Sequence, residues 1–346
     1  MPTISLNLPL VDFAAYIDAR LGGHDTAKIE AELSKQIVDA SHNVGMFYLT
    51  GHGVKRELIE QVMAVNAQFF ASTDEQKQAI STRVSTNYRG YGLLKNYRDW
   101  REQIHLGLES TVPQGATAEY WRLWGANLWP VTDTEHYKAT MLKYFDAVES
   151  LSRLTLTLIA KALGKADDFF TSRMLDRPYL LSKPMSYMPQ LGGPASPKVG
   201  VTAHCDWSWL TFLVQDNVGG LEAQDLAGNW HSVEPVSGAF VVNTGELLEI
   251  ESGGYLRASP HRVINARIDR QRYSVPLFIS PALDALILPQ PLVEQNHYQN
   301  QYIDRDHVHK VIKPGTELTN FVFGESEWQR KVKGHWCWQE HCLQKV

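Results

Sequence analysis

The sequence predicts an α+β protein in which helices flank a mainly β core of the jelly-roll, sandwich or barrel kind. Two observations lead to this fold class. In the first half of the chain apolar residues recur with the helical period of about 3.6, whereas from about residue 178 they alternate with the strand period of about 2. In the second half, short alternating segments are separated by turn residues such as Gly219-Gly220 and Gly253-Gly254, which is typical of many-stranded folds.

Three helices are expected in the first half of the chain. Residues 27–41 and 55–71 each place apolar side chains at helical spacing, and residues 132–163 form a longer pattern of the same kind. Between the first two helices, residues 45–50 form a short apolar run before a glycine turn and are expected to be a strand. Residues 80–130, which are rich in Tyr, Trp and Gly, are expected to be irregular.

The second half is expected to hold short strands separated by glycine and proline breaks. They are residues 180–188, 209–215, 220–224, 229–233, 238–243, 246–251, 261–268, 272–279 and 285–288. We divide the chain into a mainly helical N-terminal region with opening strands, a β core, and a C-terminal helical or coil cover, which span residues 1–175, 176–317 and 318–346. Because helices flank the core, the core is not expected to stand without them.

Composition excludes several classes of function. Lys plus Arg number 33 and Asp plus Glu 38, which gives a net charge of −5, so no basic excess is present to bind a nucleic-acid backbone. Three cysteines do not form a disulfide framework, and their odd number argues against secretion. The N-terminus does not read as a signal peptide, and no apolar run is long enough to span a bilayer, so we expect a cytoplasmic protein without a membrane partner.

His204, Asp206 and His261 form a candidate metal site. Residues two apart on a strand point to the same face, so the side chains of His204 and Asp206 are expected to project together while Cys205 faces away. His261 follows 55 positions after Asp206, and the intervening hairpins allow the chain to return to the same place. Two histidines and one carboxylate suit a facial triad on Fe(II), which leaves positions open for O2 and for a bidentate co-substrate.

Arg272 and Ser274 form a candidate carboxylate clamp. The two side chains share a strand face, and a guanidinium beside a hydroxyl suits one carboxylate because arginine binds it through two parallel hydrogen bonds. A 2-oxoacid with a distal carboxylate would chelate iron at one end and meet this clamp at the other. Each motif is weak alone, and it is their order along the chain that is specific.

Further motifs extend from about residue 5 to about residue 320. The core run from His204 to Asp216 reads HCDWSWLTFLVQD. The others, in chain order, are Leu8–Asp12 (LPLVD), Val44–Val54 (VGMFYLTGHGV), Phe69-Phe70 with Glu75 and Lys77, Arg89–Gly92 (RGYG), Asp99–Glu102 (DWRE), Asn127–Pro130 (NLWP), Gly219–Leu221 (GGL), Asn243–Glu246 (NTGE) and Ser259–Val263 (SPHRV). Together they resemble the Fe(II)/2-oxoglutarate-dependent dioxygenases of the isopenicillin N synthase-like superfamily.

The resemblance implies a distorted double-stranded β-helix, a cupin-like jelly roll, with Fe(II) held at His204, Asp206 and His261. It also implies that Arg272 and Ser274 hold the distal carboxylate of 2-oxoglutarate. The implied reaction oxidises a C–H bond of a small molecule with O2, by hydroxylation, desaturation or cyclisation, and releases succinate and CO2. A substrate from specialised metabolism fits this chemistry.

The family usually adds a tyrosine from an NxYP segment. Here the segment is Met185-Ser-Tyr-Met-Pro189, in which the tyrosine stands one position earlier. Strand alternation then predicts that Ser186 and Met188 face the site and that Tyr187 lies on the opposite face. Ser186 and Tyr187 are the candidates for this additional co-substrate contact.

Five further residues are candidates for the substrate pocket. Tyr91, Gln103 and His105 lie where the family often places substrate contacts. Trp207 and Phe278 flank the segments that carry the metal and co-substrate ligands. Each of these side chains could equally be part of an ordinary core, because aromatic residues dominate cores as well.

Three alternatives remain open from the sequence. An iron oxidase of the same fold that does not use 2-oxoglutarate would keep every motif. A zinc hydrolase on the same ligands would activate a metal-bound water, but it would leave Arg272 and Ser274 without a role. A non-catalytic binding protein would not need three intact ligands. With a small molecule as its partner, the protein is expected to be a monomer or a weak homodimer.

Overall fold

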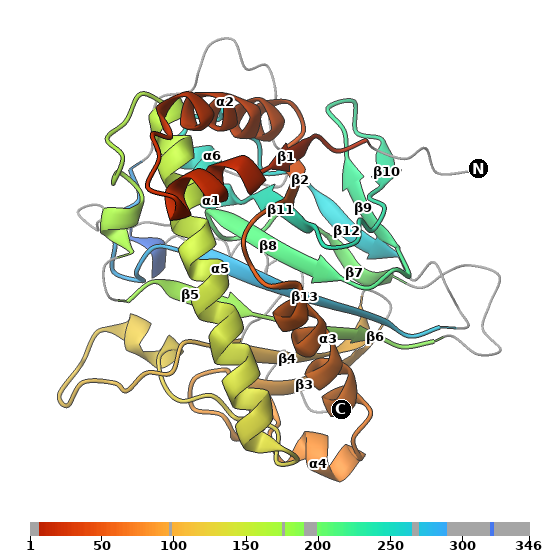
Figure 1. Cartoon of the computed structure of the whole chain (residues 1–346). Coiled ribbons are helices and arrows are strands. Elements are labelled where there is room, and N and C mark those ends of the chain that lie inside the picture. The colour runs from red at the N-terminus through yellow and green to blue at the C-terminus, as the bar shows by residue number, and fades with distance from the viewer. Residues whose placement is uncertain are drawn as a thin grey trace.

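The structure contains two β-sheets, and helices pack against the outside of the larger one (Figure 1). The computed structural model describes residues 7–96, 99–174, 177–189, 199–264, 270–288 and 319–321. Two mainly antiparallel sheets with flanking helices form the double-stranded β-helix that the sequence predicts. The expected C-terminal cover over residues 318–346 lies outside the described residues, except for Thr319–Phe321.

The larger sheet has the strand order β1-β2-β11-β8-β13-β5-β4-β3, and β6 pairs with both β13 and β4. Within the described residues all its pairings are antiparallel except that of β1 with β2. Its strands are β1 (Leu10–Asp12), β2 (Met46–Thr50), β3 (Gly90–Lys95), β4 (Trp100–Gly107), β5 (Tyr179–Ser182), β6 (Met185–Tyr187), β8 (Leu210–Gln215), β11 (Phe240–Thr244) and β13 (Arg272–Ser280). Strands from both halves of the chain therefore build one sheet.

The smaller sheet has the order β10-β9-β12-β7 and is antiparallel throughout. Its strands are β7 (Val199–His204), β9 (Leu221–Gln224), β10 (Trp230–Ser232) and β12 (His261–Ile264). A cluster of buried apolar side chains joins the two sheets, with Met46 and Val241 from the larger sheet and Val201, Leu221 and Val263 from the smaller one. We call the side of the larger sheet that meets this cluster its inner face.

The helices are α1 (Ala14–Leu21), α2 (Ala27–Asn43), α3 (Arg56–Phe70), α4 (Asp74–Gln78), α5 (Thr134–Ala162) and α6 (Glu246–Glu251), with short 3-10 turns at Thr82–Val84, Glu119–Leu123 and Thr171–Arg173. The long helix α5 runs across the outer face of the larger sheet, and α2 and α3 pack against it (Figure 1). Its buried stripe includes Phe145, Val148 and Leu156. The three helices expected from the sequence are thus confirmed.

Strand β13 shows that the two faces of the larger sheet differ: its outer face packs in the core and its inner face carries side chains that are free of this packing. Val275, Leu277 and Ile279 belong to the core cluster beneath the helices. The alternate positions, among them Ser274 and Phe278, project from the inner face because successive side chains of a strand point to opposite sides. The outer face therefore supplies packing, and the inner face can carry chemistry.

Three expected elements differ from the structure. The strand expected at residues 285–288 is absent, because only Leu286 forms an isolated bridge there, to Thr319. Residues 80–130 are not irregular throughout, because β3 and β4 lie there; β4 was hard to recognise, since both of its faces carry polar side chains. Residues 246–251 form helix α6 instead of a strand. This run is buried on all sides, and burial removes the periodicity that distinguishes a short helix from a strand.

Two further differences concern strands. The expected strand 180–188 divides into β5 and β6 around Pro184, which has no N–H for a ladder. Strand β7, which leads directly into His204, was not predicted.

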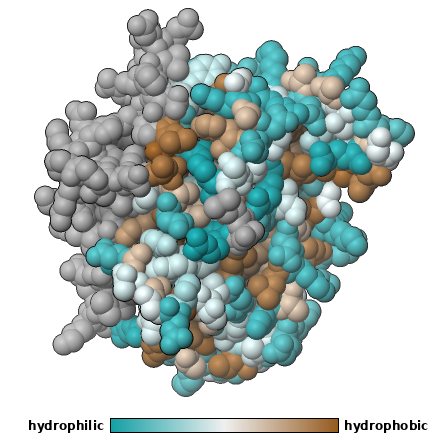
Figure 2. Space-filling model, turned by 90° about the vertical axis from the view of Figure 1, so that its left-hand side faces the viewer, coloured by the Kyte–Doolittle hydropathy of each residue, from teal (hydrophilic) through white to brown (hydrophobic). Residues whose placement is uncertain are grey.

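Among the described residues, no helix is both long enough and apolar enough to cross a bilayer. On the face shown in Figure 2, apolar residues form small separate patches among polar ones.

Candidate active site

His204, Asp206 and His261 come together at the edge of the smaller sheet. His204 ends β7, His261 begins β12, and the two residues are register partners across this strand pair. The Nε2 atoms of His204 and His261 lie 3.4 and 3.5 Å from Oδ1 of Asp206. One donor atom from each residue lies within 4.8 Å of the others. The juxtaposition expected from the sequence is therefore present.

The backbone position of Asp206 differs from the expected one. β7 ends at His204, so Asp206 stands in the loop that follows and not on the same strand. Cys205 does face away from the cluster, because it packs in the core beneath the helices and its Sγ donates to the carbonyl of Ala258.

Backbone carbonyls orient both imidazoles. Nδ1 of His204 lies 2.8 Å from the carbonyl oxygen of Thr202, and Nδ1 of His261 lies 3.0 Å from that of Ser259. A carbonyl only accepts, so each Nδ1 donates to its carbonyl and each Nε2 faces Asp206. This second contact is the usual way in which a protein fixes a metal-binding histidine.

Asp206 is held as a carboxylate with one oxygen free for the cluster. Its Oδ2 accepts hydrogen bonds from Oγ1 of Thr211 at 2.7 Å and from Nδ2 of Asn243 at 2.8 Å. Burial opposes its ionisation, but the adjacent histidines and the Thr211 hydrogen bond outweigh burial and hold the pKa of Asp206 well below its usual range. Burial also lowers the pKa of His261 and so favours its neutral form. Two imidazoles and one carboxylate fit a divalent metal with open positions.

Arg272 provides a second feature of the inner face. Its Nη2 donates to Oε1 of Gln215 at 2.7 Å, and its guanidinium lies 4.6 Å from the centre of the Tyr187 ring. The Nε and Nη1 atoms are buried and have no hydrogen-bond partner in the described structure. A buried charge that lacks partners is costly, so the two remaining donors suit an anionic ligand such as a carboxylate.

The structure corrects the expected orientation of Ser186 and Tyr187. Tyr187 is the register partner of Arg272, and its hydroxyl lies 3.4 Å from Oγ of Ser274, so it shares their inner face. Ser186 points the other way, where its hydroxyl accepts from the side chain of Gln271. The prediction that Ser186 faces the site and Tyr187 does not was wrong. The alternation was right, but it was counted from Pro189, which lies beyond the end of β6.

The five pocket candidates separate into two groups. Gln103 and His105 lie on the inner face of β4, where Nε2 of Gln103 is 3.0 Å from Nε2 of His105. Phe278 lies on the inner face of β13, and Trp207 follows Asp206 directly. Tyr91 was wrongly expected there, because it is buried in the outer core and its hydroxyl donates to Oε1 of Glu102.

Sequence reasoning missed several functional side chains. Thr211 and Asn243 hold Asp206, and Gln215 holds Arg272. The signal that could have found them is a polar residue at an inner position of an otherwise apolar strand, as in the FVVNT run of β11.

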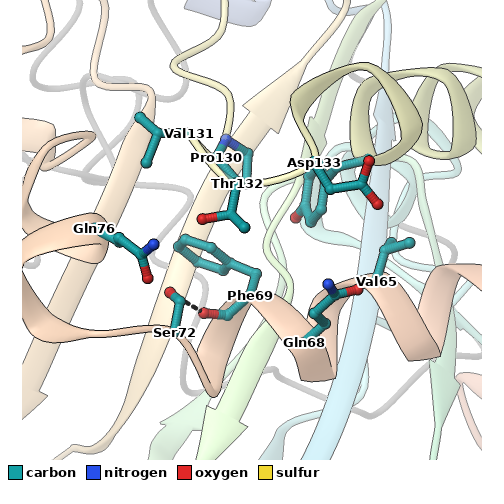
Figure 3. Close-up of a pocket in the computed structure, with 10 residues that line it drawn as sticks. Val65, Gln68, Phe69, Ser72, Gln76, Pro130, Val131, Thr132 and Asp133 are labelled. Carbon is teal, nitrogen blue, oxygen red and sulfur yellow. Dashed lines mark hydrogen bonds between the residues drawn. The ribbon is translucent and has the colours of Figure 1, made fainter.

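A separate cavity of about 30 Å³ lies between the end of α3 and the loop before α5 (Figure 3). It is lined by Val65, Gln68, Phe69, Ser72, Gln76, Pro130, Val131, Thr132, Asp133 and Tyr137. This volume is close to that of one water molecule, and none of these residues belongs to the metal cluster or the Arg272 pocket.

Two family models match the chain. Residues 8–132 match the model described as non-haem dioxygenase in morphine synthesis N-terminal. Residues 183–281, which contain His204, Asp206, His261 and Arg272, match the model of the 2OG-Fe(II) oxygenase superfamily.

Curated relatives and solved structures agree with these matches. The chain is 32% identical over 300 residues to a probable iron/ascorbate oxidoreductase of Dictyostelium discoideum, covering 79% of this chain and 81% of the relative. It is 33% identical over 293 residues to the 2-oxoglutarate-Fe(II) type oxidoreductase hxnY of Emericella nidulans, covering 79% of each. In fold it is similar to a full-length Neurospora crassa protein solved in complex with alpha-KG and 5-formyluracil, with a TM-score of 0.70 and 22% identity, covering 94% of this chain and 99% of that one.

Proposed function

The chain belongs to the 2OG-Fe(II) oxygenase superfamily, and from this premise we propose that His204, Asp206 and His261 hold its Fe(II) and that Arg272 holds the distal carboxylate of 2-oxoglutarate. The protein is an oxidoreductase that uses Fe(II), 2-oxoglutarate and O2. When bound, iron and the 2-oxoacid supply the oxidising chemistry, in which 2-oxoglutarate becomes succinate and CO2 while a substrate C–H bond is oxidised.

The observation that carries this assignment is the pair of unpartnered nitrogens on buried Arg272. A hydrolase that used only the metal cluster would have no reason to keep a guanidinium with idle donors on the same inner face. A carboxylate that accepts from Nε or Nη1 would satisfy one of these idle donors through a charge-assisted hydrogen bond. The hydroxyls of Ser274 and Tyr187 lie beside this guanidinium and can donate to the same anion.

The chain's own residues prepare the metal site. Thr211 and Asn243 occupy one oxygen of Asp206, so the other oxygen is directed at the metal. The carbonyls of Thr202 and Ser259 keep a proton on each Nδ1, so both Nε2 atoms remain ligands. These contacts set the orientation of the ligands before metal arrives and reduce the cost of binding it.

The substrate is a small molecule bound on the inner face, and we propose that Gln103, His105, Trp207 and Phe278 line its pocket. Their positions on β4, on β13 and directly after Asp206 support this assignment. The net charge of −5 favours a small molecule over nucleic acid.

The assignment is tested by adding Fe(II) and 2-oxoglutarate to the protein under anaerobic conditions. We expect a weak visible metal-to-ligand charge-transfer band, because the 2-oxoacid chelates the iron. His261→Ala should lose the band, whereas His24→Ala, which changes an exposed histidine, should keep it.

Two outcomes would contradict the assignment. Iron binding without a band on addition of 2-oxoglutarate would favour the iron-only oxidase. A band of full strength in His261→Ala would show that the metal lies elsewhere.

A further inference from the structure

Arg89 is a second buried arginine whose charge the proposed reaction does not use. Its side chain is 3% exposed, and its Nη1 atom has no hydrogen-bond partner. Within the described residues the guanidinium forms neither a hydrogen bond nor an ion pair. Burial lowers the pKa of Arg89, but arginine stays protonated in proteins, so a buried positive charge remains without a direct partner.

The guanidinium of Arg89 lies on the inner face of the larger sheet. A Cβ atom added to Gly107 would come within 1.6 Å of Nη1 of Arg89, so the guanidinium occupies the space above this glycine. Gly107 is two positions after His105 on β4, so this space is on the side to which the His105 side chain points. The absence of a side chain at Gly107 is what admits the arginine.

The row of residues beside Gly107 leads to the metal cluster. Gly107 pairs with Leu181, Leu181 pairs with Phe278, and Phe278 pairs with Thr211, which holds Asp206. Neighbouring strands lie about 4.8 Å apart, so the row from Gly107 to Thr211 spans at most about 14 Å. The separation of Arg89 from the metal cluster is therefore within the length of a small molecule.

Aromatic side chains lie along the same path. The ring of Tyr179 is 6.1 Å from that of Trp207, and the positive charge of Arg89 acts on the Tyr179 hydroxyl. Nζ of Lys183 lies 5.2 Å from the centre of the Phe278 ring and adds positive charge to this region.

The acidic group that acts on Arg89 already has other partners. Glu109 acts on Arg89 through space, but its carboxylate accepts from Trp129 and from the backbone of Asn127. Arg89 therefore keeps donors for a ligand.

Arg89 and Arg272 cannot serve the same carboxylate. The guanidinium of Arg89 lies in the row of residues that contains Phe278. Arg272 stands six positions before Phe278 on β13, and six residues of an extended strand span about 20 Å. If Arg272 binds 2-oxoglutarate, the charge of Arg89 is left for a different anion.

We propose that Arg89 binds a carboxylate of the prime substrate, and that the apolar body of this substrate lies against Tyr179, Trp207 and Phe278. This inference rests on the proposed function and narrows its substrate class to small carboxylic acids with an aromatic or apolar body. A planar guanidinium matches a carboxylate through two parallel hydrogen bonds. The oxidised carbon lies at the end of the molecule remote from the carboxylate.

The probe for this proposal is 3-phenylpropanoate, with 3-phenylpropanamide as its neutral counterpart and 2-phenylethyl phosphate as a second anion. Binding is measured by calorimetry on the full chain loaded anaerobically with Fe(II) and 2-oxoglutarate. We expect the carboxylate to bind at least about 10-fold more tightly than the amide, because charge-assisted hydrogen bonds are lost in the amide. In Arg89→Met the affinity for the carboxylate should fall by roughly 10- to 150-fold, while the affinity for the amide should not change.

Two further variants keep the test decisive. Gly107→Ala should displace the guanidinium without removing its charge and should give the same selective loss, even if Arg89→Met fails to fold. Arg83→Met changes an exposed arginine of the same segment and should keep the preference for the carboxylate.

Several results would overturn the proposal. In the wild-type protein these are equal binding of carboxylate and amide, no binding of the carboxylate, or tighter binding of the phosphate ester. In the variants, it is an unchanged preference for the carboxylate over the amide in both Arg89→Met and Gly107→Ala. The charge-transfer band of the wild-type protein separates this failure from failure of the proposed function. If the band forms, only the role of Arg89 is refuted, whereas if it does not form, the proposed function itself fails.

Discussion

Replacing Arg272 with lysine should weaken the binding of 2-oxoglutarate without preventing iron from binding. Arg272 uses Nη2 for Gln215 and leaves Nε and Nη1 without partners, so the wild-type guanidinium can offer more than one donor to a bound anion. Lysine keeps the positive charge but presents a single ammonium without the planar fork. Arg272→Lys therefore removes one charge-assisted hydrogen bond and also leaves Gln215 without its donor.

The size of the effect follows from this count of donors. A hydrogen bond to a charged group contributes about 1.5–3 kcal/mol, and each 1.4 kcal/mol changes a dissociation constant tenfold. The apparent Kd of 2-oxoglutarate should therefore rise by roughly 10- to 150-fold. Ser274→Ala removes a neutral donor, which contributes about 0.5–1.5 kcal/mol, so its effect should stay near tenfold or below.

The assay is an anaerobic titration of the Fe(II)-loaded protein with 2-oxoglutarate, followed by the visible charge-transfer band. Arg153→Lys is a matched control, because Arg153 donates through two nitrogens to Glu149 on the outside of α5. The control should leave the titration unchanged. If Arg272→Lys also left it unchanged and altered only the affinity for the prime substrate, Arg272 would be a substrate residue, and the reasoning would be refuted.

Three further predictions concern other parts of the structure. Asn243→Ala removes a donor to Asp206 and should weaken Fe(II) binding by about 10- to 100-fold, measured by competition with a chelator; unchanged affinity would contradict the role of this contact. Lys77→Met leaves Glu102 buried without its cation and should lower the free energy of unfolding by about 3–5 kcal/mol in urea, while the charge-transfer band remains. Burial opposes the ionisation of Asp225, but hydrogen bonds from the His231 side chain and from Asn229 and Ala227 in its turn outweigh burial and lower its pKa to about 2. The stability that this shift contributes is present above the unfolded pKa of about 3.9 and is lost as pH falls toward 2. Asp225→Asn should therefore lower the free energy of unfolding by up to about 2 kcal/mol at pH 6 and by almost nothing at pH 2.

The helices and the juxtaposition of the metal ligands could be predicted from the sequence because they depend on local patterns. The period of apolar residues fixes the helical stripe of α5, and the histidine-carboxylate set requires particular side chains in a particular order. Strand β4 could not be predicted in the same way. Its inner face carries Gln103 and His105, and its outer face carries buried Glu102, so the polar residues hide the alternation that identifies a strand.

The orientation of Tyr187 shows a second limit. Alternation along a strand gives relative faces, but the absolute face depends on which strand it pairs with. That partner is β13, in which Arg272 and Ser274 already point to the inner face, and this pairing is a tertiary property. The position of Arg89 above Gly107 has the same origin, since it requires β3 to pair with β4 in the register that sets Gly90 opposite His105.

The register pair of His204 with His261 links metal binding to folding of the smaller sheet. The two residues are opposite each other on β7 and β12, with irregular register just beyond them. A metal held by both would close a long loop of the chain, and at a concentration 100 times its Kd it would stabilise the folded state by about 2.7 kcal/mol. A slip of β12 by one residue would turn His261 to the opposite side of the sheet. Iron loading should therefore slow amide hydrogen exchange in β7 and β12 together, and loss of the metal should leave these two strands as the first to open.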